Sequence, residues 1–295
     1  APRVALQGDA PPGDALFAGG HLGPPLHLVE RPPASLALRV ALAGGADRDA
    51  GRVGGAVVPV EPGGPGLGGE TGFGDLVRSL GADPRSILEQ HGIEPRAIRD
   101  PDAYIETKSL VDMLEYCSLA FNDSLFGLRL AQFQEPDVFG SVAALCRSAS
   151  TFREAVVSFI DFIPVVHSPV AVLELAESKH TAELRWHMQT DLGQNNQAQY
   201  KATLLILKLL RQIGGRAFQP SYVNLAVDSR QRDLPEISQH FGCPFHKSTN
   251  NVIAFPAESI NQPVGSSNRL LFRLLGGYLS RAIGSAVLFH STSRR

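Results

Sequence analysis

Three residues in the middle of this sequence are the first candidates for acid–base catalysis. Asp161, His167 and His187 flank Phe162 and Trp186, and a carboxylate near an imidazole is a common acid–base pair. After residue 72, however, the sequence has no G-x-S-x-G nucleophile motif, no phosphate-binding loop and no dinucleotide-binding glycine motif. A histidine beside aromatic residues also often hydrogen-bonds to a backbone carbonyl. We therefore expect no catalytic residue and no enzyme.

A metal site is the second kind of chemistry to consider. His240, Cys243 and His246 lie across a Phe–Gly–Cys–Pro turn, and zinc accepts side chains of both types as ligands. A structural zinc ion takes four ligands, and no carboxylate or second cysteine completes this set. Cys117, Cys146 and Cys243 are widely spaced and odd in number, so they form no disulfide framework and indicate a reducing cytoplasm. We expect neither a metal nor another cofactor.

Small-molecule binding is better supported, because a binding pocket needs an apolar wall and a few converging polar groups. Side chains of both kinds occur near the junction between residues 73–163 and residues 164–265, the two halves described below. We predict these ligand-binding residues: Phe162, His167, Trp186, His187, Asn195, Asn196 and Tyr200. The two asparagines begin a predicted helix, whose N-terminal dipole would favour an anionic group of the ligand. The alternative is that these residues are only helix caps and solvated polar side chains.

Residues 73–163 are predicted to be helical, because apolar residues recur every three or four positions. Asp83–Pro84 is typical of a helix start, and Thr107 is predicted to cap the next helix. Further along, two short helices are predicted to meet at Ser150–Thr151, where one hydroxyl caps the second helix. This helical half precedes the residues that we expect to bind the ligand.

Residues 164–265 have a different pattern. Apolar residues alternate around Val172–Leu175 and Ala182–Met188, which predicts an antiparallel hairpin. The strongest predicted helix is Asn195–Ile213, with an apolar stripe made of Ala198, Ala202, Leu205, Ile206, Leu209 and Ile213. Strands at Tyr222–Val227 and Val252–Phe255, with a short helix between them, complete the order β-β-α-β-α-β. The predicted class is α+β, a mainly antiparallel sheet crossed by one long helix after a helical half.

Three short segments of the helical half carry a resemblance to a known family. Asp123–Leu130 has the sequence DSLFGLRL, Phe139–Val142 has FGSV, and Ser150–Ala155 has STFREA. They resemble recurring segments of the arabinose-binding-like N-terminal domain of AraC-type bacterial transcription regulators. The resemblance extends in register from Gly74 to Pro263.

The resemblance implies that residues 73–265 form a domain that senses a small-molecule effector and dimerises. The family name does not identify that effector. Residues 266–295 are predicted to be a linker or dimerisation helix, followed by a tail unlike the family. The apolar residues of this helix are Leu270, Leu271, Leu274, Leu275 and Leu279. They are expected either to pack on their own domain or to pair two copies of the chain as a homodimer.

Full-length members of the family continue into a domain with two helix-turn-helix units, for which this sequence has no matching segment. We therefore expect this chain to be a regulator truncated before that domain. The chain itself is expected to bind no DNA directly, whereas its full-length parent would bind DNA. The formal net charge of −2 gives no general attraction to nucleic acid or to anionic lipid.

Residues 1–72 contain 16 Gly and 10 Pro, a composition typical of a disordered segment, and we interpret them as a disordered or spurious extension. Their apolar runs are too short for a membrane span, and no convincing secretory signal is found, so a cytoplasmic location is expected. The main hypothesis is thus a ligand-sensing and dimerising domain. The alternatives are a ligand-free protein-interaction domain and, with no catalytic cluster to support it, a small-molecule enzyme.

Overall fold

The structure is a computed structural model, and it describes residues 72–95, 105–166 and 171–292. The predicted extension 1–72 lies outside these residues except for its last position, and so does His167. The helices before the sheet are α1 (Phe73–Ser79), α2 (Pro84–Gln90), α3 (Thr107–Ala120), α4 (Phe126–Gln132), α5 (Gly140–Ser148) and α6 (Phe152–Val166), with the 3-10 turn η2 (Pro136–Phe139) before α5.

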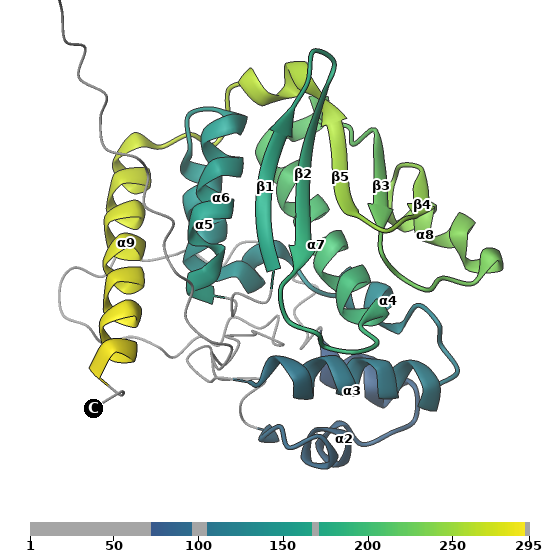
Figure 1. Ribbon diagram of the computed structural model, residues 1–295. Helices are drawn as coiled ribbons and strands as arrows, with labels where there is room; N and C mark the ends of the chain where they lie inside the picture. The colour runs from purple at the N-terminus through teal and green to yellow at the C-terminus, as the bar shows by residue number, and fades with distance from the viewer. Residues whose placement is uncertain (1–71, 96–104, 167–170, 293–295) are drawn as a thin grey trace, which may run out of the picture. The chain divides into compact units, whose positions relative to one another are not determined.

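A five-stranded sheet and a long helix make up the second half of the fold (Figure 1). Its elements are β1 (Ala171–Glu177), β2 (Thr181–Met188), α7 (Asn196–Gly214), β3 (Tyr222–Leu225), α8 (Leu234–Phe241), β4 (Phe245–Lys247) and β5 (Asn251–Pro256). The strand order is β1-β2-β5-β3-β4, and only the β3–β4 pair is parallel. The prediction of an α+β fold with a mainly antiparallel sheet and one long helix is confirmed. Strand β4 was not predicted, because three residues are too few to give an alternating pattern.

The described residues form two hydrophobic clusters. The larger one joins α4 to α8, the sheet and the last helix, and the smaller one joins α1–α4. The predicted helical half is therefore divided: α5 and α6 pack with the sheet, α1–α3 form the smaller cluster, and α4 contributes to both. Helix α7 contacts α3 and α4 on one side and α5 and α6 on another, so it connects the two clusters.

Two predicted helix caps are confirmed and one is wrong. The Asp83 carboxylate accepts the Arg85 N–H at 3.1 Å, and the Thr151 hydroxyl accepts the Glu154 N–H at 3.1 Å. Thr107, in contrast, is the first residue of α3 and not its cap. Its Oγ1 is buried and has no hydrogen-bond partner among the described residues.

The predicted apolar stripe of α7 is wrong in one informative position. Between Gln197 and Leu210 the only exposed residue of the helix is Ala202, which belongs to the predicted stripe, whereas Lys201 and Thr203 on either side of it are buried. The reason is that α7 is surrounded by packed elements on nearly all sides, so its polar side chains are buried as well. A helix that is apolar around most of its circumference is typical of a core position.

The last helix, α9 (Arg269–Thr292), packs on α5 and α6 (Figure 1) and extends beyond the predicted end near Ile283. Leu279 is fully buried and Leu275 is half-buried against the larger cluster. The remaining predicted residues of this helix, Leu270, Leu271 and Leu274, are exposed, as is Tyr278. Within the described part of the chain, no helix is both long enough and apolar enough to cross a membrane.

Candidate functional site

The N-terminus of α7, which we expected to attract an anionic ligand group, already faces a carboxylate of the protein. Glu115 of α3 accepts the Gln197 N–H at 2.7 Å. Burial raises the pKa of Glu115, and hydrogen bonds from the backbone of Gln197 and Asn196 oppose that shift. Because this carboxylate occupies the positive end of the helix dipole, the helix terminus has no need of an external anion.

Gln197 is a buried glutamine whose side chain joins α7 to α4 and α3. Its Oε1 accepts the Gly127 N–H at 2.9 Å, and its Nε2 donates to Ser124 O at 3.0 Å and to Ser118 Oγ at 3.2 Å. A Cβ atom at Gly127 would lie 2.1 Å from the Gln197 carbonyl oxygen. The glycine of the FGLRL segment is therefore required by the close approach of α4 to α7.

Asn196 and Tyr200 both bind the loop that follows β3. Asp228 N–H donates to Asn196 Oδ1 at 3.0 Å, and the Tyr200 hydroxyl lies 2.6 Å from Ser229 Oγ. Lys247 of β4 also donates to the loop, to Ser229 O at 2.9 Å. Burial raises the pKa of Tyr200 to about 12, so its phenol is neutral at physiological pH. The structure therefore brings these two predicted site residues to a loop of the chain, where both are hydrogen-bonded.

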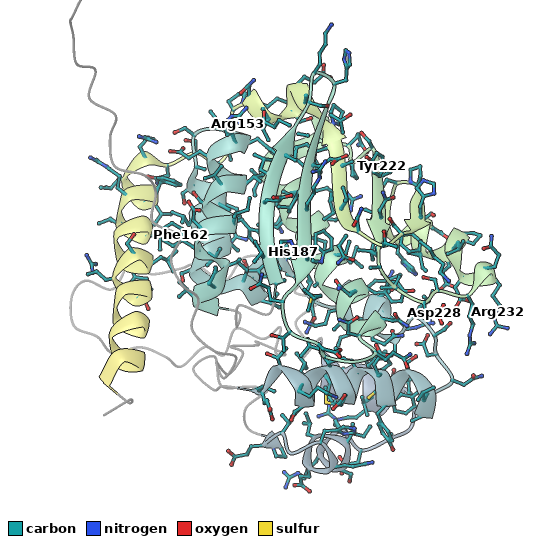
Figure 2. The ribbon with its side chains drawn as sticks, viewed as in Figure 1. Arg153, Phe162, His187, Tyr222, Asp228 and Arg232 are labelled. Carbon is teal, nitrogen blue, oxygen red and sulfur yellow. The ribbon has the colours of Figure 1, made fainter. Side chains whose placement is uncertain are left out.

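The aromatic residues of the predicted site belong to one hydrophobic cluster. Trp186 is 7% exposed and its Nε1 donates to Gln199 Oε1 of α7 at 3.0 Å, while Phe162 of α6 is half-buried against the same cluster. His187 follows Trp186 on β2, so its side chain projects from the opposite face of the sheet and is exposed (Figure 2). Asn195 is half-buried at the start of α7, and its side chain makes no capping hydrogen bond.

The residues considered for acid–base and metal chemistry do not converge. Asp161 is exposed, and partial burial raises the pKa of its carboxyl. His240 Nδ1 lies 2.6 Å from Gln132 Nε2, and burial raises the pKa of the Cys243 thiol to about 11. No group of three or more histidine, cysteine, aspartate or glutamate side chains able to hold a metal is found in the residues described.

Ala202 is an exposed residue in the otherwise mostly buried first half of the central helix. Ala198, one turn earlier, is half-buried, so the two alanines form a small-residue strip along α7 that we call the Ala198–Ala202 strip. Successive helix residues are rotated by about 100°, which places Lys201 and Gln199 about 80° to either side of this strip. The strip is therefore flanked by the lysine on one side and by the glutamine that binds Trp186 on the other.

Comparison with known proteins assigns the family. The model of the arabinose-binding domain of AraC transcription regulators, an N-terminal domain, matches residues 81–264. The chain belongs to this family. Two curated relatives, both named HTH-type transcriptional regulator VirS, come from two strains of Mycobacterium tuberculosis (CDC 1551/Oshkosh and ATCC 25618/H37Rv). Each is 28% identical over 179 residues, covering 58% of this chain and 52% of the relative.

The chain thus spans about half the length of these curated relatives. A crystal structure of the transcriptional regulator CdpR from Pseudomonas aeruginosa is also similar, with a TM-score of 0.48 and 16% identity, covering 74% of this chain and 70% of that one. The family match includes all elements from α2 to β5. Both the Gln197 hydrogen bonds and the Ala198–Ala202 strip therefore lie inside the AraC-family domain.

Sequence reasoning did not find Glu115, Gln197 or Lys201. The signal that would have found the lysine is the run of apolar residues around it: Leu204–Leu207 and Leu209–Leu210 occupy most of the circumference of α7. Most positions of such a helix are buried, so a lysine on it is expected to be at least partly buried. No comparable signal exists for Glu115, whose partner lies 82 positions away in the sequence.

Proposed function

We propose that this chain is the effector-sensing and dimerising part of an AraC-type transcription regulator. The membership of the family supports a small-molecule effector, and the relatives' names identify them as regulators of transcription. One observation carries the sensing half of the proposal: the central helix, buried along most of its length, is exposed at Ala202. We propose that a small molecule binds against this exposed part of the helix.

The effector site is proposed to lie beside α7, against the cluster that contains Phe162 and Trp186. Gln199 precedes Ala202 by three residues, so these side chains are neighbours on the helix surface, and Gln199 binds Trp186. Of the other predicted site residues, Asn196 and Tyr200 are proposed to act by holding the β3–α8 loop. Asn195, His167 and His187 remain predicted to contact the ligand.

A thermal-shift screen of the whole chain against amino acids, sugars, short carboxylates and aromatic acids tests the sensing function. A ligand at about a hundred times its dissociation constant stabilises the folded state by roughly 2.7 kcal/mol, which raises the melting temperature by several degrees. We expect a reproducible increase with one chemical class. A screen in which no compound of any class raises the melting temperature would count against sensing and favour the ligand-free interaction domain.

Dimerisation is proposed to use the exposed side of α9, made of Leu270, Leu271 and Leu274. Leu275 and Leu279 pack instead on their own domain. The beginning of the helix is fixed to α6: Arg269 donates to Glu154 Oε1 at 2.9 Å. Since α6 contacts α7 as well as α9, a ligand that favours one arrangement of α6 would alter the position of α9.

Removing the exposed leucines tests the dimer. We expect the double variant Leu270→Asp/Leu274→Asp to be a monomer with an almost unchanged melting temperature, whereas the wild type is a dimer by light scattering. Leu119→Asp is the matched control, because Leu119 is a 76% exposed leucine of α3, and it should leave the dimer intact. A monomeric wild type, or a double variant that stays dimeric, would remove α9 from the proposal.

We also propose that this chain alone does not bind a promoter. Its formal net charge is −2, and DNA binding in the regulator is assigned to a helix-turn-helix part such as the relatives' names indicate. An electrophoretic mobility-shift assay with a promoter fragment checks this. Tight binding that resists salt would contradict it, because phosphate contacts alone weaken steeply as the salt concentration rises.

A further inference from the structure

Lys201 is a buried lysine for which the structure provides no partner. It is 7% exposed, and no hydrogen bond or ion pair to its Nζ is found within the described residues. Of the other buried polar residues of α7 nearby, Gln197, Gln199 and Tyr200 each hydrogen-bond to another part of the chain, whereas the Thr203 hydroxyl is buried without a partner among the described residues. Burying a charged group without a partner costs more than burying a hydroxyl, so Lys201, which is 7% exposed, needs an explanation more than Thr203 does.

The carboxylates of α3, which contacts α7, and the one just before α4 have partners of their own. Glu115 of α3 accepts from the Gln197 backbone, and Asp123, before α4, accepts two hydrogen bonds from Arg129. Asp112 of α3 is paired with Lys108. The pKa of Lys201 is lowered to about 8 by burial alone, without any contribution from a carboxylate. At neutral pH this amine is still mostly protonated, so the cation is present and lacks a counter-ion.

The position of Lys201 on α7 is the second observation. The lysine borders the Ala198–Ala202 strip, which is exposed at Ala202 and packs against the smaller cluster at Ala198, and Gln199 with Trp186 lies on the opposite border. A ligand lying over the two alanines would therefore meet a cation on one side and a large apolar ring on the other. Small residues leave room for such a ligand, and a few polar groups in an apolar site fix its orientation.

We propose that Lys201 binds the anionic group of the effector, and that the effector is a small organic carboxylate whose apolar part lies toward Trp186. This inference rests on the proposed sensing function and specifies the ligand class for the same site. Binding would supply the counter-charge that the folded chain lacks. A charge-assisted hydrogen bond between the ammonium and the carboxylate would form where solvent is excluded.

The test compares paired ligands on the full chain: acetate, propionate, benzoate and phenylacetate, each against its uncharged amide, with inorganic phosphate as a second anion. We expect at least one carboxylate to raise the melting temperature of the wild type and its amide to fail. Lys201→Met should weaken that carboxylate by about 10- to 100-fold, the range for loss of a hydrogen bond to a charged group. Phosphate binding without carboxylate binding would overturn the assignment of a carboxylate.

Lys208→Met is the matched control. Lys208 lies on the same side of α7, two turns further on, but its Nζ donates to Gln134 O at 2.6 Å and to Gln132 O at 3.1 Å. We expect this variant to bind the carboxylate with the wild-type affinity. Equal weakening by both substitutions would indicate an unspecific effect of charge and would overturn the role of Lys201.

Calorimetry of the wild type provides a test that needs no variant. An anion beside an amine of pKa about 8 raises that pKa, so binding at about pH 8.5 should take up protons. The measured enthalpy would then depend on the ionisation enthalpy of the buffer, and this dependence should disappear in Lys201→Met. If only uncharged compounds bind, or if a carboxylate binds without proton uptake, the assignment of Lys201 is wrong but the sensing function stands. The absence of any ligand would overturn sensing itself.

Discussion

Gln197 and Lys201 lie one turn apart on α7 and are 3% and 7% exposed, but they differ in their hydrogen bonds. The glutamine side chain has partners on three segments of the chain, whereas the lysine has none among the described residues. The comparison separates two reasons for burying a polar side chain. A group whose hydrogen bonds are complete within the fold stabilises it, and a group without partners is available to a ligand at a cost to stability.

Gly127→Ala should have the largest effect, because it removes the contact that brings Gln197 to α4. The added Cβ would lie 2.1 Å from a backbone oxygen, which no rotation of a side chain relieves. We expect a loss of about 4 kcal/mol or more in the free energy of unfolding, measured by urea denaturation. Gly276→Ala in α9 is the control: its Cβ would meet Leu145 at 3.9 Å, an ordinary contact, and stability should not fall. A Gly127→Ala protein of wild-type stability would show that α4 and α7 are not so close.

Gln197→Met should have the next largest effect. The substitution keeps the length of the side chain but leaves the Gly127 N–H and the Ser124 carbonyl without their partner. We expect a loss of about 3 kcal/mol in urea denaturation, since each unsatisfied buried group costs about 1–3 kcal/mol. Gln212→Met, at an exposed glutamine of the same helix, should change stability by less than about 0.5 kcal/mol. Similar losses in both variants would mean that the buried hydrogen bonds of Gln197 add little.

Lys201→Met should change the free energy of unfolding in the opposite direction. Removing an unpaired buried cation is expected to stabilise the ligand-free chain by about 2 kcal/mol at neutral pH. The folded-state pKa of about 8 lies below the ordinary value of 10.5, so the unfolded chain binds more protons between these values. The stability of the wild type should therefore rise with pH across that window, and the variant should lack this rise. A destabilised Lys201→Met protein would indicate a structural role for the lysine.

Much of the fold was predictable because local rules and tertiary packing agree in it. Asp83 and Thr151 cap their helices as predicted, and the β1–β2 hairpin has the alternation seen in the sequence. The prediction failed where tertiary packing decides. The helical spacing of apolar residues places Ala202 in the stripe of α7, whereas neighbours on almost every side bury the rest of the helix and leave Ala202 exposed.

The candidate site was predictable only in part, for a related reason. The burial of Trp186 and the partial burial of Phe162 follow from their size and apolar character, while their role in ligand binding stays a prediction. Whether a polar residue is free to bind a ligand depends on partners distant in sequence. Tyr200 is satisfied by Ser229, 29 positions away, and Gln197 by Gly127, 70 positions away, so nothing in their local sequence distinguishes them from Lys201.

Tyr200→Phe should have the smallest effect of the series and sharpens the comparison, because Tyr200 is the satisfied neighbour of Lys201. The substitution removes the hydroxyl that lies 2.6 Å from Ser229 Oγ but keeps the ring against Phe245. We expect a loss of about 1 kcal/mol at neutral pH, measured by urea denaturation, where Lys201→Met gives a gain.

The loss of stability caused by Tyr200→Phe should also depend on pH in a different way from the gain caused by Lys201→Met. Burial raises the pKa of Tyr200 from 10.0 to about 12, so above about pH 10 the unfolded chain releases a proton that the folded chain retains. The wild type should then lose stability through this group as the pH rises, while Tyr200→Phe should not. The cost of Tyr200→Phe should accordingly shrink above about pH 10, whereas the gain from Lys201→Met shrinks already from about pH 8. The stability changes caused by Tyr200→Phe and by Lys201→Met should thus vary over different pH ranges. If they varied over the same range, one titrating group would explain both, and the distinction between the hydrogen-bonded Tyr200 and the unpaired Lys201 would be wrong.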